Sequence, residues 1–116
     1  MTFGDMAYSQ FVEEMFKKKP EWAAAFVGNF AELHAVMGLS GEVGEVVDII
    51  KKHVFHGKRL DRRHLIEEIG DVEFYLEALR QVYDIDRDFT ITQNWNKLTG
   101  RHPEGIENST HYKEGT

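Results

Sequence analysis

The chain has 116 residues, a formal net charge of −6 at pH 7 and a hydrophobic fraction of 41%, which fits one domain with a modest core. The acidic balance argues against broad attraction to a nucleic-acid backbone, so we expect no nucleic-acid polymer as a partner. Cysteine is absent, which excludes disulfide and thiolate chemistry, and no apolar run approaches the length of a membrane span. We therefore expect a cytoplasmic protein without membrane contact.

The first predicted helix runs from Asp5 to about Lys18, where apolar residues fall near one face. Pro20 ends it. The lysine run at 17–19 is typical of a solvated helix end, with a phosphate contact as the alternative.

The second predicted helix runs from Phe30 to about Phe55, with Asn29 as its N-cap and Gly57 just past its end. Three glycines lie inside this predicted helix: Gly38, Gly41 and Gly44. Each weakens a helix by about 1 kcal/mol relative to Ala. Their spacing predicts a smooth track that lets a backbone or ligand come close, and a kinked or broken helix is the alternative.

The third predicted helix follows Asp61 and extends to about Tyr83, and its apolar stripe steps regularly by four and three residues. A fourth helix is predicted from about Arg87 to Thr99, where β-branched residues at 89–92 leave a short strand as the alternative. Together these elements predict an all-α domain over residues 1–103, followed by a loosely ordered polar tail at 104–116. The two central helices are long for a 13.5 kDa monomer, so we expect a four-helix bundle completed by oligomerisation, at least a dimer.

Two short carboxylate pairs lie on the central helices, each with its acids three residues apart on one helical face: Glu42 with Glu45, and Glu68 with Asp71. If the helices pack antiparallel, four carboxylates converge, and their repulsion favours a bound cation. An all-oxygen site suits Mg²⁺, with Mn²⁺ as a substitute. The neighbouring acids are interpreted as ordinary surface charge: Asp48, Glu67, Glu73 and Glu77.

Other chemistries fit the sequence less well. Di-iron bundles use Glu-x-x-His pairs, and no Glu here has a His three residues later. His53 and His56 have the spacing of a metal pair but no third ligand nearby, so helix-end polar residues are the simpler interpretation. No P-loop or Ser-His-Asp arrangement is present in the sequence.

Three segments together resemble the MazG-like family of all-α nucleoside triphosphate pyrophosphohydrolases, over about residues 29 to 103. They are Leu33-His-Ala-Val-Met-Gly-Leu-Ser-Gly-Glu-Val-Gly-Glu45, Ile50-Lys-Lys-His-Val-Phe-His-Gly57 and Glu67-Glu-Ile-Gly-Asp-Val-Glu-Phe-Tyr-Leu76. The family pattern ExxE, spacer, ExxD is matched at all four acids. The segment Asn94 to Pro103 resembles the family's fourth-helix Asn/Lys/Arg cluster, although Gly100 stands where a helix-friendly residue is common.

The resemblance implies a hydrolase that cleaves an NTP or dNTP between the α and β phosphates, for pool sanitation or modulation. It implies that the four acids hold Mg²⁺ and that a bound water attacks the α-phosphorus, with Glu45 as the candidate base. Candidate substrate-binding residues are His34, Lys52, Tyr75, Asn94, Lys97 and Arg101. Trp22 and Trp95 are further candidates for stacking. The expected partners are a nucleoside triphosphate and further copies of the chain, as a homodimer or homotetramer. The alternative is a non-catalytic helical module that binds nucleotide or metal.

Overall fold

The computed structural model describes residues 5–17 and 30–106. The described part contains four helices and no strand: α1 (Asp5–Lys17), α2 (Phe30–Phe55), α3 (Arg62–Val82) and α4 (Arg87–Arg101). The all-α prediction is therefore confirmed. The predictions for Lys18, Pro20, Trp22 and Asn29 fall outside the described residues.

The second helix has the predicted bounds and is uninterrupted, so its glycines do not break it. It ends at a turn in which Gly57 adopts φ 65°, a left-handed conformation that costs least at glycine. The Lys58 N–H donates to the Lys52 carbonyl at 3.3 Å across this turn. A local sequence signal therefore reverses the chain at the predicted residue.

Side-chain caps set the beginnings of α3 and α4. Asp61 accepts a hydrogen bond from the His64 N–H at 3.1 Å, and Asp86 accepts one from the Phe89 N–H at 2.9 Å. Each cap satisfies one of the amide groups left free in a first helical turn. α4 continues through Gly100 to Arg101, two residues further than predicted, and the β-branched segment at 89–92 is helical.

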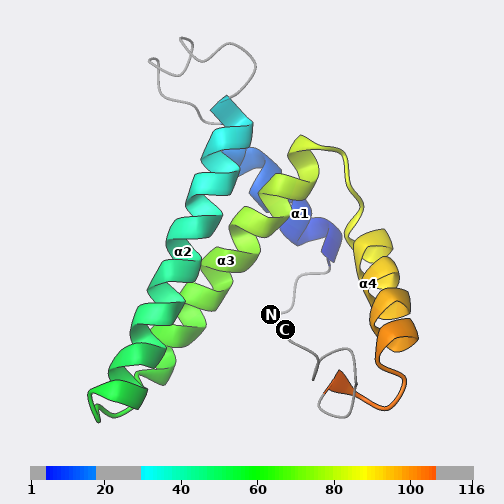
Figure 1. The fold of residues 1–116 in the computed structure, drawn as a ribbon. Coiled ribbons are helices and arrows are strands. Elements are labelled where there is room, and N and C mark those ends of the chain that lie inside the picture. Colours follow the sequence, from blue (N-terminus) through cyan, green and yellow to red (C-terminus); the bar gives the residue numbers. More distant parts are fainter. Residues whose placement is uncertain (1–4, 18–29, 107–116) are drawn as a thin grey trace. The chain divides into compact units, whose positions relative to one another are not determined.

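Two compact units make up the chain, residues 1–84 and residues 85–116. In the first unit α2 and α3 pack as an antiparallel pair joined by the turn at 56–61, and α1 packs against the end of the pair opposite this turn (Figure 1). A small core forms there from Val12, Ala35 and Ala78. Residues around it are Tyr8, Phe16, Phe74 and Leu79. α4 belongs to the second unit.

A buried polar network joins α1 to α3, and it corrects the prediction that Glu77 is surface charge. Glu77 is 6% exposed and accepts hydrogen bonds from Ser9 Oγ at 3.1 Å, Arg80 Nε at 2.8 Å and Gln81 Nε2 at 2.9 Å. Burial raises the pKa of its carboxyl, but these three donors outweigh it and hold the pKa below its usual value. Glu77 therefore acts as a structural anion between the two helices.

Gly38 on α2 packs directly against the Tyr75 ring on α3. A Cβ atom added there would lie 2.6 Å from Tyr75 Cζ, whereas one added at Gly41 or Gly44 would meet nothing within 4 Å. The predicted smooth track is thus a close contact at Gly38, filled by the Tyr75 ring, and an open surface at the other two glycines.

Gly38→Ala is expected to lower the free energy of unfolding by about 1–3 kcal/mol, because the Tyr75 ring must leave its packed position. Gly41→Ala is the matched control, and it should raise the same quantity by about 1 kcal/mol through helix propensity. Urea unfolding of both variants provides the measurement. In a Tyr75→Ala background, Gly38→Ala should become stabilising, and a persistent loss there would contradict the steric explanation.

Candidate metal centre and its surroundings

Three of the four predicted acids converge between α2 and α3. Glu42, Glu68 and Asp71 each offer a carboxylate oxygen, and these oxygens lie within 4.8 Å of one another. The spacing of three residues puts Glu68 and Asp71 on one face of α3, and the antiparallel packing of α2 brings Glu42 against that face. The grouping therefore follows from one local spacing and one helix–helix contact.

The electrostatics of this cluster are unfavourable without a cation. A hydrogen bond shared with Glu68, desolvation and the charge of Asp71 raise the pKa of Glu42 from 4.5 to about 7. Glu68 Oε2 is buried and has no hydrogen-bond partner among the described residues. Its other oxygen, Oε1, lies 3.3 Å from His64 Nε2. A buried carboxylate oxygen and the mutual repulsion of neighbouring acids, which raises the pKa of Glu42, both fit a site for a hard divalent cation with oxygen ligands.

Glu45 lies one turn beyond Glu42 on α2 and is exposed. It is outside the group of three converging oxygens, but its negative charge is one of the factors that raise the pKa of Glu42. Its role as a ligand or base therefore stays a prediction.

Aromatic side chains surround His34 at the end of the helix pair next to α1. The His34 ring stacks on Phe16, with ring centroids 4.5 Å apart and an interplanar angle of 15°. Tyr75 meets the same imidazole edge-on at 5.8 Å, and Phe30 lies at 5.5 Å. His34 and Tyr75, each predicted separately as a substrate-binding residue, thus lie together. The sequence did not predict that Phe16 belongs to this cluster, because nothing in the sequence of α1 indicates which helices it packs against.

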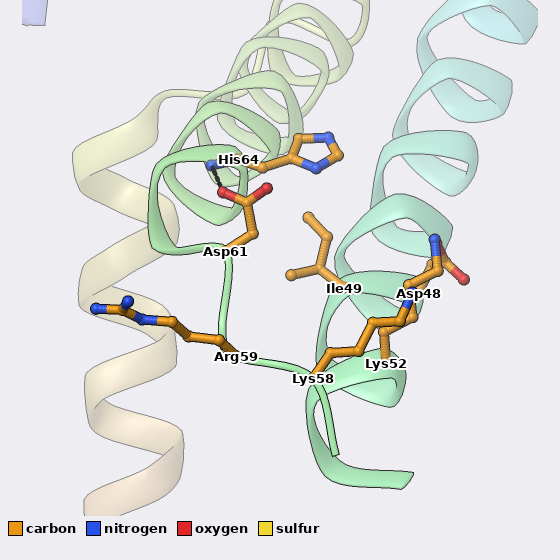
Figure 2. Close-up of a pocket in the computed structure, with 7 residues that line it drawn as sticks. All are labelled: Asp48, Ile49, Lys52, Lys58, Arg59, Asp61 and His64. Carbon is orange, nitrogen blue, oxygen red and sulfur yellow. Dashed lines mark hydrogen bonds and ion pairs between the residues drawn. The ribbon is translucent and has the colours of Figure 1, made fainter. Parts of the chain in front are cut away.

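A pocket of about 240 Å³ lies at the opposite end, beside the α2–α3 turn (Figure 2). Its lining residues are Asp48, Ile49, Lys52, Lys58, Arg59, Asp61 and His64. Lys52 Nζ pairs with Asp48 Oδ2 at 2.8 Å. His64 was not predicted as a site residue, although its position four residues before Glu68 places both on one helical face. The pocket lies next to the cluster of Glu42, Glu68 and Asp71, but none of these three residues lines it.

The fourth-helix candidates Asn94, Lys97 and Arg101 are exposed on α4, as is Trp95 at 69%. These residues belong to the second compact unit. Their contact with substrate stays a prediction.

The raised pKa of Glu42 has a measurable consequence for the metal-free protein. The folded state binds the proton of the Glu42 carboxyl more tightly than the unfolded state does. Its contribution to the free energy of unfolding is therefore fully present below pH 4.5 and is lost as pH rises to about 7. Glu42→Gln removes the repulsion and should raise the melting temperature at pH 8 in a chelator, with little difference from wild type at pH 4.5.

Circular dichroism during heating provides this measurement, and the exposed Glu67→Gln serves as the control. Added Mg²⁺ should stabilise the wild type at pH 8 and have a much smaller effect on Glu42→Gln. Equal melting temperatures of the two proteins at pH 8 without metal would contradict the assigned repulsion.

Comparison with known proteins identifies a family for most of the chain. The family model for the MazG nucleotide pyrophosphohydrolase domain matches residues 30–106. The chain is also 32% identical over 78 residues to the Gene 37 protein of Mycobacterium phage L5, covering 63% of this chain and 68% of that protein. No solved structure matches the chain. In the described part, no helix is both long enough and apolar enough to cross a membrane.

Proposed function

Because the chain belongs to the MazG nucleotide pyrophosphohydrolase family, we propose that it cleaves a nucleoside triphosphate between the α and β phosphates in a Mg²⁺-dependent reaction. The products are the nucleoside monophosphate and pyrophosphate. Sanitation or adjustment of the cytoplasmic nucleotide pool is the role that we assign to this reaction. The observation that carries the proposal is the convergence of Glu42, Glu68 and Asp71 within 4.8 Å.

The acids would hold the metal, and the surrounding residues would hold the nucleotide. When bound, Mg²⁺ neutralises triphosphate charge and activates the attacking water; Mn²⁺ has the same preference for oxygen ligands. Glu45, outside the converging group, is our candidate for the base that accepts a proton from this water. Lys52 on α2, with Lys97 and Arg101 on α4, is proposed to contact the phosphates.

The nucleoside would lie toward the aromatic end of the helix pair. Tyr75 is one turn beyond Asp71 on α3, and His34 is two turns before Glu42 on α2, so both rings follow the acids along the same seam. Aromatic rings and an imidazole suit stacking on a nucleobase. Asn94 is proposed to contact the sugar or base from α4.

The test is incubation with Mg²⁺ and a panel of NTPs and dNTPs, with both products identified. The proposal predicts pyrophosphate with the matching monophosphate, and no turnover in chelator. Release of orthophosphate would show that a different phosphoanhydride bond is cleaved and would contradict the family reaction.

A non-catalytic nucleotide- or metal-binding module is the second candidate. The exposed position of Glu45, which leaves three converging acids, is the observation that favours it. Metal-dependent thermal stabilisation without hydrolysis of any nucleotide in the panel would support this second function instead.

The oligomer is proposed from an apolar stripe on α2 that faces away from the acids. Its members recur at helical spacing and are 39–61% exposed: Val36, Val43, Val47, Ile50 and Val54. Ile66 and Ile69 on α3 are 59% and 53% exposed. An amphipathic stripe of this length is expected to be covered by another chain. We therefore propose a homodimer or homotetramer, and light scattering at micromolar concentration should give at least twice the 13.5 kDa chain mass. A monomeric mass would contradict it.

A further inference from the structure

The segment from the last turn of α2 to the first turn of α3 is strongly basic although the chain as a whole is acidic. Residues 51–64 contain six Lys and Arg residues and one acid, a formal charge of +5, whereas the whole chain carries −6. The other residues therefore carry −11. A concentrated positive charge in an acidic protein is typical of a local anion site.

The pocket beside the α2–α3 turn collects part of that charge. Lys52 and Lys58 both extend toward the Asp48 side of α2, whereas Arg59 points away from them (Figure 2). Lys52 pairs with Asp48 at 2.8 Å. Among the described residues, no carboxylate forms an ion pair with Lys58. Its ammonium group can therefore accept an incoming anion without giving up an existing ion pair.

Size and position restrict the occupant. The pocket, about 240 Å³, is smaller than the range of about 300–1,000 Å³ found for drug-sized ligands, so it suits a small anion better than a nucleobase. His64 lines the pocket, and its Nε2 lies 3.3 Å from Glu68 Oε1 in the acid cluster. From Glu68 to Asp61, α3 runs about two turns, roughly 11 Å. The pocket thus begins where the acid cluster ends.

We propose that this pocket holds the pyrophosphate end of the substrate, with Lys58 and Lys52 as the binding cations. The assignment rests on the proposed function. It fixes a direction along the helix pair: the nucleoside lies at the aromatic end, the α-phosphate lies at the acids, and the β- and γ-phosphates lie at the turn. Negative charge that develops on the leaving pyrophosphate is then met by the ammonium groups of Lys52 and Lys58, which outnumber the Asp48 carboxylate on the same side of the pocket (Figure 2).

The test compares Lys58→Met with Lys51→Met. Lys51 is an exposed lysine in the same basic segment that does not line the pocket. Calorimetric titration of the full chain with inorganic pyrophosphate, without metal, measures the pocket alone. Lys58→Met should weaken pyrophosphate binding by about tenfold to a hundredfold, since a charged hydrogen bond contributes about 1.5–3 kcal/mol. Lys51→Met should stay within about twofold of wild type.

Steady-state kinetics provide the second readout. Product inhibition by pyrophosphate should weaken in Lys58→Met, while inhibition by the nucleoside monophosphate stays unchanged. Equal losses in Lys58→Met and Lys51→Met that disappear at high salt would indicate diffuse attraction to the basic surface and overturn the proposal. Failure of all nucleotides to be hydrolysed would contradict the proposed function, and the pyrophosphate titration would still decide the assignment of the pocket.

Discussion

Glu68→Gln is expected to lower kcat/KM for the preferred nucleotide by about a thousandfold while the helical content stays unchanged. Glu68 belongs to the acid cluster, and its side chain is 13% exposed. A bound metal contributes several kcal/mol to transition-state stabilisation, and each 1.36 kcal/mol is a factor of ten in rate. Gln keeps the size of the side chain but removes the negative charge that would hold the cation.

The adjacent Glu67→Gln is the matched control for this prediction. Glu67 Oε1 lies 3.8 Å from Arg63 Nε, and its side chain is 61% exposed. Its kcat/KM should stay within about twofold of wild type. Both variants are assayed by pyrophosphate release across a Mg²⁺ titration, with circular dichroism to confirm folding. If Glu68→Gln retained wild-type activity, the acid cluster would not be the metal site.

The elements that the sequence predicted well are those that depend on local signals. Asp61 and Asp86 cap α3 and α4 through hydrogen bonds that span three residues. Gly57 ends α2 because glycine adopts a positive φ at little cost. The spacing of Glu68 and Asp71 is also local, and antiparallel packing of two consecutive helices was enough to predict Glu42 as their neighbour.

The features that the sequence did not predict depend on contacts between distant segments. Glu77 looked like surface charge because its burial requires Ser9, which lies 68 residues away in the chain. Stacking of Phe16 on His34 likewise requires α1 to pack against α2. Apolar periodicity on α3 was regular, yet Ile69 and Tyr83 are 53% and 55% exposed. Periodicity shows which residues share a face, but not which face a neighbouring helix covers.

The site has an order along the helix pair that neither helix shows alone. On α2 the sequence runs from His34 through Glu42 to Lys52, and α3 runs in the opposite direction from His64 through Glu68 to Tyr75. Antiparallel pairing therefore places His34 beside Tyr75 and Glu42 beside Glu68, and it brings Lys52 and His64 to the same pocket. A nucleoside triphosphate has the matching order: an aromatic base, phosphates that bind metal, and a terminal anionic group.

Arg80→Leu is expected to lower the free energy of unfolding by about 3–5 kcal/mol, because it leaves the buried Glu77 carboxylate without its cation. The two side chains are each 8% exposed and their charged atoms lie 2.8 Å apart. This loss is a large share of the free energy of unfolding of a typical domain, which is about 5–15 kcal/mol. The matched control is Arg63→Leu, whose side chain is 93% exposed, and it should cost less than about 1 kcal/mol.

The pH dependence of Arg80→Leu separates charge burial from lost packing. In the wild type the pKa of Glu77 is held low, so its stabilising contribution is present at neutral pH and is lost as pH falls through that pKa. In Arg80→Leu, burial without the guanidinium should raise this pKa, and protonation at pH 4 should then remove part of the penalty. Urea unfolding at pH 7 and pH 4 should therefore show a smaller deficit at pH 4. An equal deficit at both values would mean that Arg80 stabilises the fold through packing alone, and the buried ion pair would lose its assigned role.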